Sequence, residues 1–280
     1  FGENNFYWPN QKLKSTIYWI DNYIVNETFF DTSGQIKYTF EYKNKTGTFT
    51  IGNQEKNIEK RINLLNGVRN GLYTETLIGQ PKYEIQFKNN EKNGSYIEYG
   101  LLQKPFNNLN FIANQLHGLQ KYYDMMGNLK IEANFLAGEN TGLKTGYYFN
   151  NKKQNEGFCY NDLKKGPFCY FNHAGDTIAI LYYYYDLITS VKILNSGKLS
   201  DEILVSDKFT DFTSTYKNGK TAFKFSVKNN LFEGPFEINS EQGNTLIKCT
   251  YKDFLLDGSR IECYSDGKIY KQESFIKGYK

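Results

Sequence analysis

The sequence predicts an all-β protein, an elongated antiparallel meander of about ten stacked β-hairpin repeats of 22–24 residues. Its composition supports strands, because 17% of the residues are aromatic, with 24 Tyr and 22 Phe, and aromatic side chains favour strands over helices. Glycines recur at a nearly constant interval. Apolar and polar residues alternate ahead of these glycines, as in a strand with one buried face.

The glycine interval defines the repeat. Steps of 23 or 24 residues separate the unit glycines Gly47, Gly71, Gly94, Gly118, Gly142 and Gly166, and the series resumes at Gly234 and Gly258. Projecting back from Gly234 gives Thr210, and the 44 residues between Gly166 and Thr210 would fit two units of 22. In several units a further glycine follows nine residues later, as Gly127 follows Gly118. Each unit therefore contains two turns and two strands.

Turn residues precede each unit glycine at fixed positions. An apolar residue lies seven positions before it and a Gly, Asn or Asp four positions before it, as in Phe111, Asn114 and Gly118. These three middle residue types tolerate the left-handed backbone of a tight strand connection. Later in their units, Asn218-Gly219 and Asp266-Gly267 predict two-residue hairpin turns.

Two segments depart from the pattern. Residues 1–24 contain both tryptophans, Trp8 and Trp19, fit the repeat poorly and are interpreted as an N-terminal cap, which leaves residues 25–280 as a single repeat array. The segment Asn53 to Leu65 admits a short helix instead of a strand, because Ile58, Ile62 and Leu65 have helical spacing.

The motif Phe135-x-x-Gly138-x-x-x-Gly142, followed by Tyr147-Tyr148, resembles the MORN-repeat family, in particular its bacterial variant in YwqK-like antitoxins. The resemblance covers roughly Gly34 to Lys280, although Asn, Asp or Phe254 often replaces the first glycine. It implies a non-enzymatic binding module of stacked hairpins, and the antitoxin label implies neutralisation of a toxin. The motif itself encodes a scaffold and not a partner.

No catalytic, metal or cofactor constellation is recognisable in the sequence. His117 and His173 are the only histidines, they are not spaced as a metal pair, and we interpret both as solvated turn residues. We therefore expect no catalytic residues, no metal and no cofactor, and predict that the chain is not an enzyme. An unrecognised hydrolase, using a pair among the 30 acidic residues, stays open as an alternative.

The charge pattern points away from nucleic acid. The net charge is +4, and only three of the 34 basic residues are arginines. Lysines spread through turns commonly protect sheet edges and maintain solubility. The longest uncharged apolar stretch, Thr177 to Tyr185, is far shorter than the ~20 residues of a membrane-spanning helix, so no transmembrane helix is predicted.

The four cysteines form two pairs with related spacing. Cys159 and Cys169 are equidistant from position 164, and Cys249 and Cys263 from position 256, each midpoint lying two residues before a unit glycine. If all units share one turn, both pairs lie across adjacent strands and predict disulfides, which require Cα atoms within about 7 Å. An oxidising location, the periplasm or the cell exterior, would follow. Alternatively, free cysteines fill buried strand positions and the protein is cytoplasmic.

An aromatic row follows the unit glycines by two residues. It comprises Phe49, Tyr73, Tyr96, Phe168, Phe212 and Phe236, and it is joined two positions later by Tyr122, Tyr170 and Ile238. This row either packs as core or stays partly open for binding. For the open case we predict Tyr73, Tyr96, Tyr122 and Tyr170 as partner contacts, since tyrosine combines a large ring with a polar tip.

From these features we expect a protein-binding scaffold, specifically an immunity or antitoxin protein that neutralises a toxin by direct binding. The alternative is a surface or secreted adhesive module that binds glycan or membrane through its aromatic rows.

Overall fold

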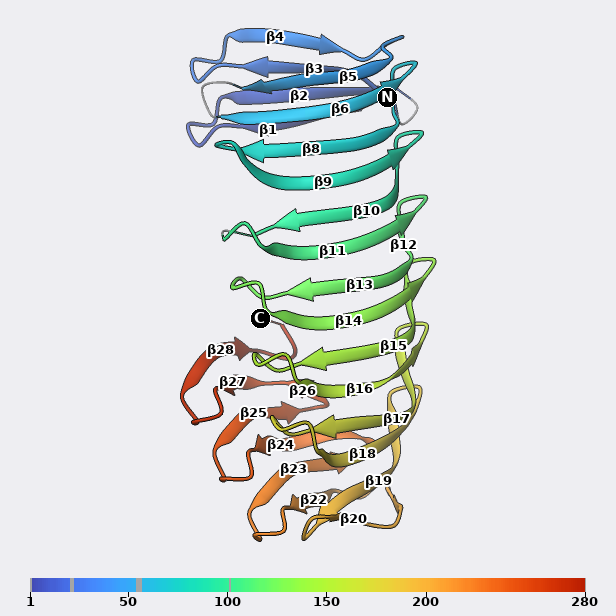
Figure 1. Cartoon of the computed structure of the whole chain (residues 1–280), viewed down its shortest axis with the longest axis vertical. Helices are drawn as coiled ribbons and strands as arrows, with labels where there is room; N and C mark the ends of the chain where they lie inside the picture. The colour runs from blue at the N-terminus through green and yellow to red at the C-terminus, as the bar shows by residue number, and fades with distance from the viewer. Residues whose placement is uncertain (1, 21–22, 54–56, 101, 280) are drawn as a thin grey trace. The chain divides into compact units, whose positions relative to one another are not determined.

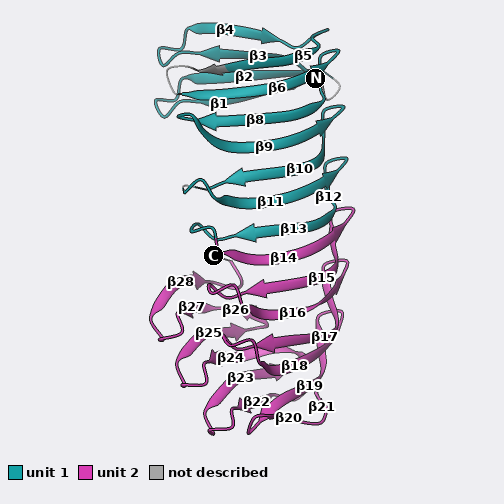
Figure 2. Ribbon diagram, in the orientation of Figure 1, with its two compact units in different colours: residues 1–127 teal, residues 128–280 magenta. Residues whose placement is uncertain are grey.

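A computed structural model describes residues 2–20, 23–53, 57–100 and 102–279. Every regular element in these ranges is a β-strand, and consecutive strands pair in antiparallel hairpins, which confirms the predicted fold class (Figure 1). The chain forms two compact units, residues 1–127 and 128–280 (Figure 2). The expected boundary after residue 24 does not separate units, because Ile24 and Val25 both lie within one strand.

Unit 1 begins with a four-stranded sheet, followed by strands of a second sheet. The first sheet comprises β1 (Gly2–Tyr7), β2 (Leu13–Ile20), β3 (Tyr23–Phe30) and β4 (Ile36–Glu41). The following strands are β5 (Gly47–Asn53), β6 (Ile58–Leu65), β7 (Val68–Arg69), β8 (Gly71–Leu77), β9 (Gln80–Lys88), β10 (Glu91–Tyr99), β11 (Pro105–Ile112), β12 (Gln115–Leu116) and β13 (Gly118–Tyr123).

The hydrophobic core of unit 1 lies between these two sets of strands. Buried Phe29 and Tyr42 from the first sheet and its continuation pack in one cluster with Ile51 of β5 and Ile62 of β6. In β6, inward Ile62 and Leu64 alternate with more exposed residues, as expected of a strand with one buried face. The first sheet thus covers one face of β5–β8.

Unit 2 also contains two sets of strands. The first comprises β14 (Leu129–Leu136), β15 (Glu139–Tyr147), β16 (Lys153–Tyr160), β17 (Leu163–Phe171), β18 (Thr177–Tyr184), β19 (Leu187–Asn195), β20 (Lys198–Leu199) and β21 (Ile203–Leu204). The second comprises β22 (Thr210–Thr215), β23 (Thr221–Lys228), β24 (Leu231–Asn239), β25 (Thr245–Lys252), β26 (Leu255–Leu256), β27 (Gly258–Cys263) and β28 (Ile269–Phe275).

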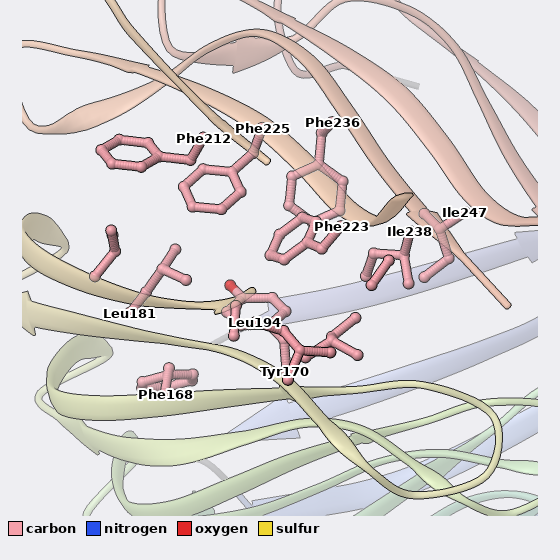
Figure 3. Close-up of a cluster of buried hydrophobic side chains, with 14 of the residues drawn as sticks. Phe168, Tyr170, Leu181, Leu194, Phe212, Phe223, Phe225, Phe236, Ile238 and Ile247 are labelled. Carbon is pink, nitrogen blue, oxygen red and sulfur yellow. The ribbon is translucent and has the colours of Figure 1, made fainter. Parts of the chain in front are cut away.

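The two sets of unit 2 strands enclose an aromatic core. Figure 3 shows rings of Phe212, Phe223, Phe225 and Phe236 from the second set facing Leu181 and Tyr170 of the first. The Tyr170 ring centroid lies 5.2 Å from that of Phe223 and 6.4 Å from that of Phe236. Unit 2 is therefore a two-layered structure in which each set of strands covers one face of the other.

The predicted left-handed turn positions are confirmed. Two-residue turns with positive φ at both residues occur at Asn89-Asn90, Ala113-Asn114, Ala137-Gly138, Asn161-Asp162, Asn229-Asn230 and Asp253-Phe254. This is the type I′ geometry, whose twist matches that of the flanking strands. The second residue of each turn is the Gly, Asn, Asp or Phe of the repeat motif.

Two turns at the opposite ends of the hairpins are longer than predicted. At Tyr216-Lys217-Asn218-Gly219, only Gly219 has positive φ, and its N–H donates to the Tyr216 carbonyl at 3.0 Å. The Asn218 side chain accepts a hydrogen bond from the Lys220 N–H at 3.0 Å. Asp266-Gly267 has the same arrangement with Lys268. These are type I turns closed by a glycine bulge instead of two-residue turns.

Two further expectations are corrected. The helix considered over Asn53–Leu65 is a strand from Ile58 onward, because Ile62 and Leu64 face the core on alternate positions; residues 54–56 lie outside the described residues. The 44 residues before Thr210 are not two regular units. A type I′-type turn at Tyr185-Asp186 continues the repeat, and the remainder, with short β20 and β21, carries the chain from one layer of unit 2 to the other.

Candidate interaction surface

The aromatic row of unit 1 lies on one face of β8–β13. Cross-strand partners share a face of a sheet, and Tyr73 pairs with Ile85, which pairs with Tyr96, which pairs with Leu109. On the same face, Tyr83 pairs with Glu98, and Asn107 pairs with both Glu98 and Tyr122. We call this surface, with Tyr73, Tyr83, Tyr96, Phe111 and Tyr122, the tyrosine face.

Only one end of the tyrosine face is covered by the first sheet of unit 1. Tyr73 packs against the buried cluster that includes Phe29 and Tyr42, whereas Tyr96 and Tyr122 are not part of that cluster. Both are partly exposed. The structure therefore places two of the four predicted contact residues on an open surface and a third, Tyr73, at its covered edge.

The rings of the tyrosine face contact one another and carry cations. The Tyr96 centroid lies 6.1 Å from that of Tyr83 and 5.8 Å from that of Phe111. Lys92 Nζ lies 5.0 Å from the Tyr96 centroid and 5.1 Å from that of Phe111. Such ring and cation–π contacts hold the side chains in place before any partner binds.

The hydroxyl groups of the tyrosine face differ in their partners. Tyr73 Oη donates to Glu75 Oε2 at 2.9 Å, and Glu75 also pairs with Lys82 at 3.1 Å. Within the described part of the chain, the hydroxyls of Tyr96 and Tyr122 form no hydrogen bond. Burial, and then the charge of Glu98, raise the pKa of Tyr96 to about 12, and burial raises the pKa of Tyr122. Both hydroxyls stay protonated at neutral pH and can donate or accept.

Tyr83 and Phe111 were not predicted as part of this surface. They lie on strands that enter a type I′ turn, opposite the strands that follow the unit glycines. The alternation of Phe111 with Asn110 was visible in the sequence, but assigning it to the face of Tyr96 requires the cross-strand register.

Tyr170 is a core residue, contrary to its predicted contact role. Only 7% of its surface is exposed, and its hydroxyl lies 3.3 Å from that of Tyr183, which is also buried. Phe168, Phe212, Phe236 and Ile238 of the same row are buried with it. In unit 2 the row packs as core because the second layer covers it, whereas in unit 1 Tyr96 and Tyr122 stay partly exposed.

The predicted disulfides are not formed, and the register explains why. All four cysteines are free. Cys169 lies opposite Glu156, three residues before Cys159. Ile247 lies opposite Glu262, and extending that register places Cys249 opposite Arg260, three residues before Cys263. An odd offset also puts the two side chains on opposite faces of the sheet.

The error lies in the assumed turn centre. One hairpin has its turn at Asn161-Asp162 and the other at Asp253-Phe254, whereas the pairing assumed turns around positions 164 and 256. Burial raises the pKa of the Cys159 thiol and that of Cys249, the latter to about 11, so both are neutral thiols inside the structure. An oxidising location therefore loses the support that the disulfides gave it.

His173 is not the solvated turn residue that we expected. Its ring centroid lies 4.2 Å from that of Tyr148 and 5.6 Å from that of Phe149, in edge-on contacts. Both ring nitrogens are buried without a hydrogen-bond partner among the described residues, and burial lowers the pKa of His173 to about 4. His173 is therefore a neutral ring packed among aromatic side chains.

Two other properties bear on function. No three His, Cys, Asp or Glu side chains gather as metal ligands do in the parts of the chain that the structure describes. The same residues contain no helix with the length and apolar character needed to cross a membrane.

Comparisons with known proteins identify no family. No protein-family model matches the chain, and no curated protein matches it. Among solved structures, a mutant of S. aureus TarM in complex with fondaparinux, α-GlcNAc-glycerol and UDP shares 12% identity over 55% of this chain, with a TM-score of 0.13. This chain spans about a fifth of TarM, since the match covers 21% of it. A likeness this weak carries no argument about fold or function.

Proposed function

We propose that this chain is a non-enzymatic protein-binding repeat scaffold and that the tyrosine face of unit 1 contacts the partner. The observation that carries the proposal is the pair Tyr96 and Tyr122, partly exposed on one sheet face with hydroxyls that bond to no other described residue. Rigid rings bury a large area at small entropic cost, and tyrosine is enriched where binding energy concentrates.

The tyrosine face carries both positive and negative charges, which favours a protein partner whose surface also carries both. Lys82 and Lys92 lie over the rings of Tyr83 and Tyr96, while Glu75 and Glu98 border the same rings. A nucleic-acid surface would carry an excess of positive charge. The resemblance of the repeat to YwqK-like antitoxins makes a protein toxin the first partner to test, with neutralisation by direct binding.

The test begins with capture of partners from the source organism on immobilised chain, followed by mass spectrometry and a binding titration with the purified partner. Tyr96→Ala and Tyr122→Ala should each weaken binding by about 1–3 kcal/mol, roughly 5- to 150-fold. Tyr123→Ala is the matched control, because Tyr123 follows Tyr122 in β13 and faces the opposite side of the sheet.

The Tyr123→Ala control also defines the results that would contradict binding at the tyrosine face. If Tyr123→Ala weakens binding as much as Tyr122→Ala, or if neither tyrosine-face variant changes affinity, the partner does not bind this face. Specific binding to a purified glycan or to lipid vesicles, abolished by the same two variants and without a protein partner, would establish the adhesive alternative instead.

A further inference from the structure

Unit 2 contains a cavity between its two layers, separate from the tyrosine face. Its volume is about 190 Å³, and its walls come from β15–β17 on one side and β24, β25 and β27 on the other. The cavity lies at the margin of the aromatic core that Figure 3 shows around Tyr170 and Phe236. It combines an apolar floor with a polar entrance.

The floor consists of buried aromatic and apolar groups. Phe168, Tyr170 and Phe236 line it, with exposed fractions of 2%, 7% and 8%. Buried Ile247 and Cys249 complete this side. Aromatic rings from both layers therefore line the cavity, together with the polar side chains of Gln154 and Asn155 in β16, and such rings suit contact with a planar apolar body.

The entrance carries three cations. Lys144 is two residues after Gly142, so it occupies the position that Tyr73, Tyr96 and Phe168 occupy in other units and points to the same face. Lys164 lies opposite the buried Cys159 and therefore also faces the cavity. Arg260 lines the cavity from the second layer. All three side chains are partly exposed.

Of the three cations at the cavity entrance, Arg260 alone forms ion pairs with carboxylates of the described residues. Its Nη1 lies 2.6 Å from Glu262 Oε1 and 3.7 Å from Glu273 Oε2. Neither Lys144 nor Lys164 pairs with a carboxylate of the described residues, and Lys164 Nζ instead lies 4.7 Å from the Tyr183 ring centroid. The cavity entrance thus keeps two uncompensated positive charges above an apolar floor.

We propose that this cavity binds a small organic carboxylate with a planar apolar body. The two lysines would hold the carboxylate through charge-assisted hydrogen bonds, and the body would lie against the rings of Phe168 and Phe236, which line the cavity. The volume is below the ~300–1,000 Å³ typical of sites for drug-sized ligands, so the ligand is about the size of a single ring. The apolar floor distinguishes such a ligand from inorganic phosphate.

The test is a ligand-observed NMR titration of the intact chain with three probes. Benzoate should bind, whereas benzamide, its neutral counterpart, and inorganic phosphate, which lacks the apolar body, should each bind at least about tenfold more weakly. Lys144→Gln and Lys164→Gln should each weaken benzoate binding about tenfold. Lys165→Gln is the matched control, because Lys165 is the exposed neighbour of Lys164 and faces the other side of β17.

Each other outcome overturns the proposal. Equal binding of benzamide and benzoate would show that the lysines do not select charge. Equal binding of phosphate would show that the floor plays no part. Absence of benzoate binding would show that the cavity is not a site for such a ligand. So would a loss of affinity in Lys165→Gln as large as that in Lys164→Gln. All three lysines are at least partly exposed, so their substitution should leave the fold intact. Far-UV circular dichroism of every variant checks that the fold is retained.

Discussion

Replacing Tyr170 with alanine should destabilise unit 2, while the same change at Tyr122 should leave stability nearly unaltered. Sequence spacing gave these two residues equivalent positions in their units, but Tyr170 is buried between two layers and Tyr122 lies on the open tyrosine face. The pair therefore compares a buried residue with a partly exposed residue at one repeat position.

The magnitude follows from what each side chain contacts. Tyr170 packs against Phe223 and Phe236 and places its hydroxyl 3.3 Å from that of Tyr183. Truncating a buried aromatic ring to alanine typically costs about 3–5 kcal/mol, and we expect Tyr170→Ala to lie in that range. Tyr170→Phe removes only the hydroxyl contact and should cost about 1 kcal/mol. Tyr122→Ala should cost less than about 1 kcal/mol.

The assay must report on unit 2. Both tryptophans, Trp8 and Trp19, lie in unit 1, so tryptophan fluorescence does not follow the unfolding of Tyr170's surroundings. Hydrogen exchange measured by mass spectrometry resolves peptides of β17, β18 and β23, whose amides should lose protection in Tyr170→Ala and keep it in Tyr122→Ala. Unchanged protection in Tyr170→Ala would refute the two-layered core of unit 2.

Three further predictions concern protonation and redox state. Because burial holds the pKa of His173 near 4 while the unfolded chain titrates near 6.5, the unfolded state binds more protons between these values, and stability should fall as pH drops from about 6.5 to 4. His173→Phe should flatten that part of the curve of unfolding free energy against pH; an unchanged slope would contradict the burial of the ring. Glu262 is 3% exposed and bonded to Lys130, Arg260 and Tyr270; burial acts to raise its pKa, but Arg260 and Lys130 outweigh it and lower the pKa to about 2. Glu262→Gln should therefore cost about 3 kcal/mol at neutral pH, and its difference from wild type in denaturant unfolding should shrink as pH falls from about 4.5 toward 2; a constant difference would argue against the ion pairs. Denatured protein treated with iodoacetamide without reductant should gain four carbamidomethyl groups by mass, whereas a gain of none would reinstate the two disulfides.

The local geometry of the repeat was predictable because it depends on backbone preferences at single positions. Asn114, Gly138 and Asp162 each lie at the second residue of a type I′ turn, where a positive φ favours Asn, Asp and Gly. Phe254 occupies the same position with a φ of 67°, although a phenylalanine gives no such signal. There the neighbouring repeats, and not the residue itself, indicated the turn.

Register was harder to predict than turns. The midpoints of both cysteine pairs have the same spacing from a unit glycine, yet each hairpin contains a bulge near that glycine. The turn at Asn161-Asp162 lies before position 164, and the shift of two residues in the pairing between Gly157 and Cys159 makes up only part of the difference. Spacing alone carries no record of such a shift, and an error of three residues changes both the partner and the face of a cysteine.

Whether the aromatic row is buried or exposed depends on contacts between strands that are distant in sequence. Tyr170 and Tyr122 occupy equivalent positions, and only the return of β22–β28 over the first layer of unit 2 buries one of them. The sequence contains a signal at this point. The row is interrupted at Gln120 and Lys144, the residues two positions after Gly118 and Gly142. Gln120 is fully buried, and its amide bonds to the backbone of Asn110 and His117, so it replaces a ring with hydrogen bonds. Lys144 has no such structural partner among the described residues, and it lies at the entrance of the unit 2 cavity. Gln120 has a structural explanation, because the fold uses it for hydrogen bonds. Lys144 leaves a cation beside an apolar cavity, which is the kind of exception expected at a binding site.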